Sequence, residues 1–141
     1  MKEVHILLVE DNEGDIVLTL DAFAESRIKT RISVVRNGQE AMDFLYKKNI
    51  YADVERPDLI LLDINIPIHN GHEVLSDIKS DPDLKKIPVI ILTTSSNPND
   101  INKAYENYTN CYITKPIEIE DFLKAILKIE EFWLTLCKLS E

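Results

Sequence analysis

The sequence predicts an α/β protein built on a doubly wound sheet of five parallel strands with five helices. Short apolar runs alternate with longer amphipathic segments along the whole chain, which is the pattern of repeated strand–helix units. Several runs are rich in Ile, Leu and Val without interruption, as expected for strands that helices cover on both faces. The chain has 141 residues, a length that suits one domain with its own core. We therefore expect residues 1–141 to form a single domain.

The expected elements follow one another with mostly short connections. Strands are predicted at residues 4–9, 31–36, 59–63, 89–93 and 111–114. Helices are predicted at residues 14–26, 39–48, 73–79, 100–108 and 118–138, and the last is an extended helix. A polar loop, residues 49–57, separates the second helix from the third strand. Right-handed crossovers would make all the strands parallel.

Composition and charge exclude several classes of function. The net charge is −9 at pH 7, which disfavours binding to the phosphate backbone of nucleic acids. No apolar run approaches the roughly 20 residues that a membrane-spanning helix needs, and the N-terminus lacks the features of a signal peptide. The two cysteines, Cys111 and Cys137, lack the spacing of a metal or redox site. We therefore expect a cytoplasmic protein that binds neither nucleic acid nor membrane.

Polar residues stand at the ends of the predicted strands. In a doubly wound sheet, ligands bind beyond the carboxyl ends of the strands. Glu10 and Asp11 follow the first strand, Asp63 ends the third, Thr93 ends the fourth and Lys115 follows the fifth. These side chains should therefore converge at one edge of the sheet.

The predicted convergence of carboxylates points to a cation and to phosphoryl chemistry. Clustered carboxylates usually need a hard cation, and Mg²⁺ prefers oxygen ligands. We expect Asp11 and Asp63 to bind Mg²⁺ directly and Glu10 to act through water. The backbone carbonyl of Asn65 would complete the protein ligands. A carboxylate can also accept a phosphoryl group as a nucleophile, and the Lys115 ammonium would then help the cation to neutralise its charge.

Two residues at the ends of the fourth and fifth strands add to this interpretation. The hydroxyl of Thr93 could donate a hydrogen bond to a phosphoryl oxygen. A cis bond between Lys115 and Pro116 would aim the lysine into the site. The alternative is a trans bond, in which the proline simply ends the strand.

With these motifs the chain resembles the receiver domain of response regulators, the CheY-like fold of two-component signalling. The matching segments are Glu10-Asp11-Asn12, Asp63-Ile64-Asn65-Ile66-Pro67 with Gly71, Thr93-Thr94-Ser95 and Tyr112-Ile113-Thr114-Lys115-Pro116. The resemblance covers essentially the whole chain, and the order of the motifs on the predicted strands makes it specific. It implies a flavodoxin-like sheet with the strand order 2-1-3-4-5.

The resemblance also implies a role for each matching residue. These roles are a phospho-acceptor at Asp63, an acidic pair for Mg²⁺ at Glu10 and Asp11, an ion pair to the phosphoryl group at Lys115, a switch hydroxyl at Thr93 and a switch aromatic at Tyr112. The donor in this family is a phosphohistidine on a sensor histidine kinase. The receiver is not an enzyme for other substrates; it performs only its own phosphotransfer and slow autodephosphorylation. Phosphorylation would stabilise a minor conformation of the face formed by the fourth helix, fifth strand and fifth helix.

The loop after the predicted acceptor departs from the family pattern. It reads Ile68-His69-Asn70-Gly71, where the family usually has an acid before the glycine. Asn70 can still take the left-handed or turn conformation needed there. His69 is interpreted as an exposed loop histidine, and His5 and His72 are given no role.

The predicted C-terminal helix carries more apolar surface than packing on a sheet requires. Phe122, Ile129 and Trp133 lie on one helical face, and Phe132 extends the apolar surface beyond it. Because exposed aromatic clusters mark contact sites, we expect a homodimer through the fourth helix, fifth strand and extended fifth helix, including Phe132 and Trp133. The end of this helix and the 49–57 loop also resemble stand-alone receivers found beside bacterial phytochrome-type histidine kinases.

Three alternatives use some of the same residues. A small Mg²⁺-dependent phosphatase or phosphotransferase would share the Asp63 nucleophile, but it would need an acid where Asn65 stands and a cap domain. A flavodoxin-type cofactor carrier would need a Ser/Thr/Gly-rich phosphate loop after the first strand, where residues 10–13 are mostly acidic. A pseudo-receiver that works without phosphorylation would lack one of the site residues. A stand-alone response regulator in a phosphorelay is therefore the favoured function.

Overall fold

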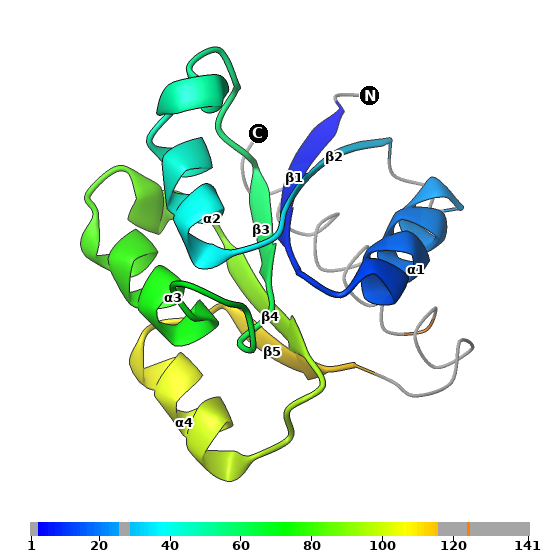
Figure 1. Cartoon of the computed structure of the whole chain (residues 1–141). Coiled ribbons are helices and arrows are strands. Elements are labelled where there is room, and N and C mark those ends of the chain that lie inside the picture. The colour runs from blue at the N-terminus through cyan, green and yellow to red at the C-terminus, as the bar shows by residue number, and fades with distance from the viewer. Residues whose placement is uncertain (1–2, 26–28, 116–123, 125–141) are drawn as a thin grey trace.

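Five parallel strands form the sheet of the computed structural model, which describes residues 3–25, 29–115 and 124 (Figure 1). The strands are β1 (Val4–Val9), β2 (Thr30–Val35), β3 (Leu59–Leu62), β4 (Val89–Thr93) and β5 (Cys111–Thr114). They lie in the order β2-β1-β3-β4-β5, and each neighbouring pair is parallel. This confirms the predicted doubly wound sheet. Because β2 and β3 flank β1 on opposite sides, the topological switch point lies between β1 and β3.

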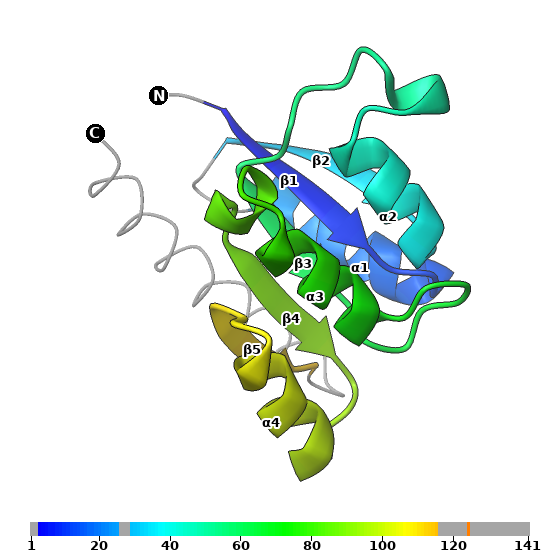
Figure 2. The same ribbon diagram turned by 90° about the vertical axis from the view of Figure 1, so that its left-hand side faces the viewer.

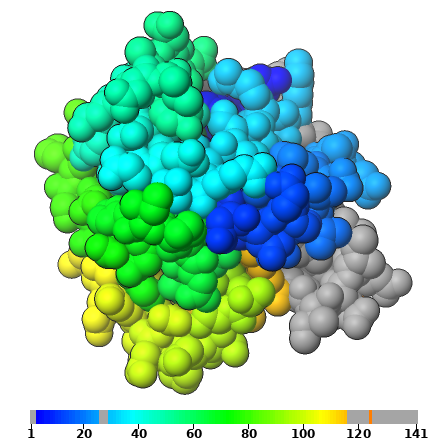
Figure 3. All heavy atoms as spheres, viewed as in Figure 1, coloured from blue at the N-terminus to red at the C-terminus, as the bar shows by residue number. Residues whose placement is uncertain are grey.

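Helices cover both faces of the sheet (Figures 1 and 2). They are α1 (Glu13–Ala24), α2 (Gly38–Leu45), α3 (Gly71–Ser80) and α4 (Pro98–Glu106), with short turns of 3-10 helix at η1 (Asn49–Tyr51) and η2 (Leu84–Lys86). In the space-filling view, α2, α3 and α4 form a continuous layer (Figure 3). Within the described residues, each helix is too short or too polar to cross a bilayer.

The fifth predicted helix, residues 118–138, lies outside the described residues apart from residue 124. The predicted dimer residues Phe132 and Trp133 lie outside them too, as does the bond from Lys115 to Pro116.

Alternate residues of each strand enter two apolar clusters, one on each face of the sheet. Leu7 and Val9 of β1 belong to the cluster that includes Leu75 and other residues of α2, α3 and α4. Ile6 and Leu8 belong to the cluster that includes α1. This period of two follows from the strand pleat, and each fully buried Leu or Ile side chain contributes roughly 1.5–3 kcal/mol. The two clusters hold the C-terminal ends of the strands in fixed positions.

Asparagine residues cap the N-termini of the helices that follow these strand ends. Asn12 accepts a hydrogen bond from the first turn of α1, and Asn70 and Glu73 form a reciprocal capping box at the start of α3. α4 begins at Pro98 and not at residue 100 as predicted, because Asn97 caps it and proline suits the first helical position. The chain thus enters each helix directly from a strand-end loop.

The polar loop predicted at residues 49–57 contains the short η1 turn. Lys47 and Asn49 have left-handed φ angles of 57° and 56°, and they reverse the chain after α2. The ring of Tyr51 packs against Phe44, with 5.2 Å between the ring centroids. This aromatic contact orders a segment whose composition alone indicated only a loop.

Candidate functional site

The carboxylates predicted for the site meet at the C-terminal ends of β1 and β3. Val9 and Leu62 are paired in the sheet, and the amide of Asp63 donates to the carbonyl of Val9 at 3.1 Å. This pairing sets Glu10 and Asp63 side by side as the strands end. Carboxylate oxygens of Glu10, Asp11 and Asp63 lie within 4.8 Å of one another. Glu10 and Asp63 are buried, whereas Asp11 is exposed to solvent.

Lys115 brings a positive charge into this cluster from the end of β5. Its amide donates to the carbonyl of Thr93 at 2.6 Å. Its ammonium donates to Glu10, to Asp15 at 3.0 Å and to Asp63 at 3.3 Å, and only 4% of its side chain is exposed. Asp15 was not among the residues predicted for the site. Asp15 lies in the first turn of the helix that follows the acidic pair, and this position could have indicated that its side chain lies near the site.

The electrostatics of the cluster keep Asp63 ionised. Burial raises the pKa of Glu10 to about 7, although the hydrogen bond from Lys115 opposes this rise. Burial also pushes the pKa of Asp63 upward, but the Lys115 charge and the Thr93 hydroxyl outweigh it and hold the pKa below its ordinary value. Desolvation lowers the pKa of Lys115, but the contacts with Glu10 and Asp63 have the larger effect and raise it above its ordinary value. At neutral pH a negative Asp63 therefore lies next to a positive Lys115.

The other predicted residues lie around Asp63 and the loop between β4 and α4. The amide of Asn65 donates to Oδ1 of Asp63 at 3.2 Å. Thr93 is fully buried, and its hydroxyl accepts a long hydrogen bond, 3.4 Å, from the amide of Ser95. The hydroxyl of Tyr112 donates to the carbonyl of Ser95 at 2.7 Å. Thr93 and Tyr112 are thus joined through Ser95, the last residue of the matching segment Thr93-Thr94-Ser95.

The segment between β3 and α3 packs tightly against the site. A Cβ atom on Gly71 would lie 2.3 Å from the carbonyl oxygen of Asp63, so only glycine fits there without a shift of the backbone. The left-handed residue of this loop is Ile68, with φ of 72°. Asn70, to which the sequence analysis assigned a turn or left-handed conformation, is extended and caps α3.

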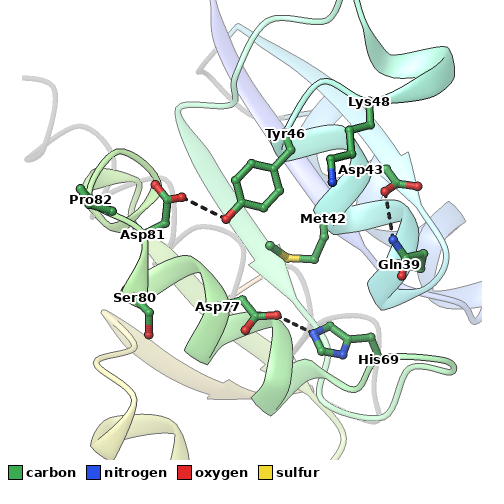
Figure 4. Close-up of a pocket in the computed structure, with 10 residues that line it drawn as sticks. All are labelled: Gln39, Met42, Asp43, Tyr46, Lys48, His69, Asp77, Ser80, Asp81 and Pro82. Carbon is green, nitrogen blue, oxygen red and sulfur yellow. Dashed lines mark hydrogen bonds and ion pairs between the residues drawn. The ribbon is translucent and has the colours of Figure 1, made fainter.

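A cavity of about 540 Å³ lies between α2 and α3, and none of the predicted site residues lines it (Figure 4). His69 lies at its edge, with Nε2 2.7 Å from Asp77 and Nδ1 3.3 Å from Glu73. His69 is therefore half-buried and paired with carboxylates, unlike the exposed loop histidine of the sequence interpretation. The helix that carries Glu73 and Asp77 was predicted, but the path of the loop that brings His69 against it was not.

The fold and the site together define a receiver-type domain. Acids after β1 and β3 and a lysine after β5 meet at the switch point of a 2-1-3-4-5 sheet. The model of the response regulator receiver domain family matches residues 6–127. The chain therefore belongs to this family and is a receiver of two-component signalling, and the phosphatase alternative is not favoured.

The relatives of the chain include phytochrome response regulators. Response regulator Rcp1 of Synechocystis sp. is 46% identical over 129 residues, which cover 92% of this chain and 88% of Rcp1. The probable methanogenesis regulatory protein FilR2 of Methanothrix harundinacea is 40% identical, with 92% and 83% covered. The structure of the phosphorylated cyanobacterial phytochrome response regulator RcpA matches with a TM-score of 0.91 at 47% identity and covers 96% of both chains. The Mn²⁺-bound form of Rcp1 matches with a TM-score of 0.88 at 45% identity, covering 93% and 94%.

Proposed function

We propose that the chain is a response regulator that accepts a phosphoryl group on Asp63 from a sensor histidine kinase. The observation that carries this proposal is the position of the buried Asp63 carboxylate, 3.3 Å from the ammonium of Lys115. An ionised carboxylate can act as the nucleophile in phosphoryl transfer. A fixed cation beside it offsets the charge that the phosphoryl group brings.

In the proposed transfer, an oxygen of Asp63 bonds to phosphorus as the bond from phosphorus to the donor's histidine nitrogen breaks. The donor imidazole leaves with the electron pair of that bond. Lys115 then forms an ion pair with the phosphoryl group, and the Thr93 hydroxyl donates to one of its oxygens. The Asn65 amide orients the carboxylate during transfer. The chain acts as a phospho-acceptor, with only self-phosphotransfer and slow autodephosphorylation, and not as an enzyme for other substrates.

The acid cluster fits Mg²⁺. Its donors are carboxylate oxygens, and Glu10, Asp11 and Asp63 together carry more negative charge than Lys115 can balance. We assign Asp11, Asp63 and the backbone carbonyl of Asn65 to the ion, with Glu10 acting through water. When bound, Mg²⁺ supplies charge neutralisation for the phosphoryl oxygens. The Mn²⁺-bound structure of Rcp1 supports a divalent cation in a relative.

The proposed donor is a phytochrome-type histidine kinase, because RcpA, a phytochrome response regulator, is 47% identical to this chain. A kinase of this type uses ATP, so we also propose a cytoplasmic location. Phosphorylation would shift the population of conformations at α4, β5 and the C-terminal segment.

The proposed output is a protein contact on the α4–β5 face. Tyr105 and Tyr108 expose 51% and 76% of their surface there, which supports a contact surface. We propose a homodimer on this face that includes Phe132 and Trp133. Sedimentation of variants with alanine at positions 132 and 133 tests the dimer, and an unchanged dimer or a monomeric parent protein would count against it.

Radiolabelled acetyl phosphate tests the proposed acceptor. The parent protein should take up label in the presence of Mg²⁺. It should take up little label when EDTA is added before the acetyl phosphate. Asp63→Asn should take up none, and the surface control Asp53→Asn should label normally. Equal labelling of Asp63→Asn, or no label on the folded parent protein, would contradict the proposal.

A further inference from the structure

The ammonium of Lys115 has one anionic partner outside the acid cluster. Oδ2 of Asp15, in the first turn of α1, lies 3.0 Å from Nζ of Lys115, whereas Oδ2 of Asp63 lies 3.3 Å from it. Glu10 accepts a further hydrogen bond from the same ammonium. A lysine ammonium has three N–H donors, so the three carboxylates together engage all of them and fix its position.

Asp15 differs from the other two partners of Lys115 in its relation to the cation site. Carboxylate oxygens of Glu10, Asp11 and Asp63 lie within 4.8 Å of one another, and among the described residues Asp15 does not join this group. The proposed function assigns Glu10 and Asp63 to Mg²⁺, through water or directly. An oxygen that faces the cation has less charge to offer the ammonium. Asp15 is therefore the carboxylate that can stay with Lys115 while Mg²⁺ is bound.

The backbone of Asp15 is held firmly enough to position a long side chain. Its amide donates to Oδ1 of Asn12 at 3.0 Å, and its carbonyl accepts from the hydroxyl of Thr19 at 2.8 Å. The next residue, Ile16, is buried in the apolar cluster that includes α1. The side chain of Asp15 is 30% exposed, so water and salt screen its charge only in part. The helix thus presents a carboxylate of fixed position to Lys115, whose flexible stem would otherwise allow many rotamers.

We propose that Asp15 is a positioning residue that holds the Lys115 ammonium beside Asp63 when Mg²⁺ and a phosphoryl group occupy the site. This inference rests on the proposed function of Asp63 and of the acid cluster. A bound Mg²⁺ repels the ammonium and takes up the negative charge of Glu10 and Asp63 that attracts it. The charge of Asp15 offsets this repulsion, and its hydrogen bond leaves the remaining N–H groups of Lys115 directed at the phosphoryl oxygens.

A matched control is present in the same turn of α1. An acid in the first turn of a helix also stabilises the helix through its macrodipole, and this effect does not involve Lys115. Glu13 is the other acid of this turn, and it pairs with Arg36 at 2.6 Å. Glu13→Ala therefore removes a first-turn acid and an ion pair, but no contact of Lys115.

Beryllofluoride is a suitable probe, because it occupies a phosphoryl site without a transfer step. Fluorine NMR titration at saturating Mg²⁺ gives its affinity and excludes any change in cation occupancy. Asp15→Ala should bind beryllofluoride roughly fivefold more weakly, since an ammonium that is no longer held loses part of its charge-assisted contact with the probe. Glu13→Ala should bind it as tightly as the parent protein does.

A double-mutant cycle tests whether Asp15 acts through Lys115. In the Lys115→Met background, Asp15→Ala should change the affinity by less than about twofold, because no ammonium remains to be positioned. Equal losses in the two backgrounds, or unchanged or tighter binding in Asp15→Ala alone, would overturn the inference while the proposed function stands.

A second measurement decides if Lys115→Met does not fold or binds too weakly to be titrated. The Nζ signal of Lys115 in nitrogen NMR of the beryllofluoride complex should shift in Asp15→Ala and stay in place in Glu13→Ala. An unshifted signal in Asp15→Ala would overturn the inference. A folded parent protein that does not bind beryllofluoride with Mg²⁺ would refute the proposed function and this inference with it.

Discussion

Replacement of Lys115 by methionine tests the electrostatics of the strand ends. Methionine keeps most of the length and apolar packing of the side chain but removes the ammonium that Glu10, Asp15 and Asp63 share. The side chains of Lys115, Glu10 and Asp63 are only 4%, 3% and 9% exposed. Water therefore cannot easily replace the lost partner, and the substitution leaves buried negative charges together.

The expected cost can be estimated from these contacts. A pair of charges 3.0 to 3.3 Å apart attracts by about 5 kcal/mol at an effective dielectric constant of about 20, and desolvation offsets much of this. Removing one partner of a buried pair costs about 3–5 kcal/mol. Glu10 has a pKa of about 7 and can take up a proton when Lys115 is absent. We therefore expect the loss of folding stability to lie at the lower end of this range, at about 3 kcal/mol. In a domain of this size that lowers Tm by roughly 10 °C.

The cost should depend on pH and on Mg²⁺. The pKa of Glu10 is raised, so the folded protein keeps a proton that the unfolded chain releases between its ordinary value of 4.5 and about 7. Without Lys115 this pKa rises further, so the loss of stability should be larger at about pH 8 than at about pH 6. Mg²⁺ should stabilise Lys115→Met more than the parent protein.

Thermal and urea unfolding, followed by circular dichroism, measure these changes. Lys86→Met, which removes an exposed lysine, is the control and should change stability by less than about 0.5 kcal/mol. A loss below about 1 kcal/mol for Lys115→Met, or a loss independent of pH, would refute the reasoning.

Three further predictions concern stability. Gly71→Ala should lower the free energy of unfolding by about 2 kcal/mol or more in urea, because its Cβ would lie 2.3 Å from the Asp63 carbonyl oxygen. In the control Gly14→Ala the Cβ would lie 3.3 Å from a side-chain oxygen, and the free energy of unfolding should not fall. Equal losses in the two variants would contradict the predicted clash at Gly71. Asn70→Ala should lose about 1 kcal/mol by removing the capping box of α3, and an unchanged midpoint would show that the cap does not stabilise the helix. Burial, followed by the charge of Arg31, lowers the pKa of His5 below 6.5, so the stability of the fold should fall as pH drops through about 6.5. His5→Gln should flatten the dependence of stability on pH in this range. An identical slope in the variant would exclude His5 as the cause of the pH dependence.

The strand-end residues could be predicted because topology alone places them. Parallel strands end at the same edge of a sheet, so Glu10, Asp63 and Lys115 had to approach one another once the strands were recognised. Strand positions were accessible because continuous apolar runs mark them directly.

Contacts between helices and loops could not be predicted in the same way. The approach of Asp15 to Lys115 depends on how α1 is rotated about its axis. The pairing of His72 with Asp100 depends on the relative placement of α3 and α4. The local pattern of a single segment indicates which face of a helix is buried, but it does not give the distance between side chains on different elements, because tertiary packing sets the relative placement of those elements.

Identification of the modified residue tests the central claim most directly. The protein is incubated with Mg²⁺ and acetyl phosphate and then reduced with borohydride, which converts an aspartyl phosphate to homoserine, and peptides are analysed by mass spectrometry. We expect homoserine at position 63 in the parent protein and none in Asp63→Asn. Homoserine at another acid such as Asp11, or its absence from the folded and Mg²⁺-saturated parent protein, would contradict Asp63 as the phosphoryl acceptor.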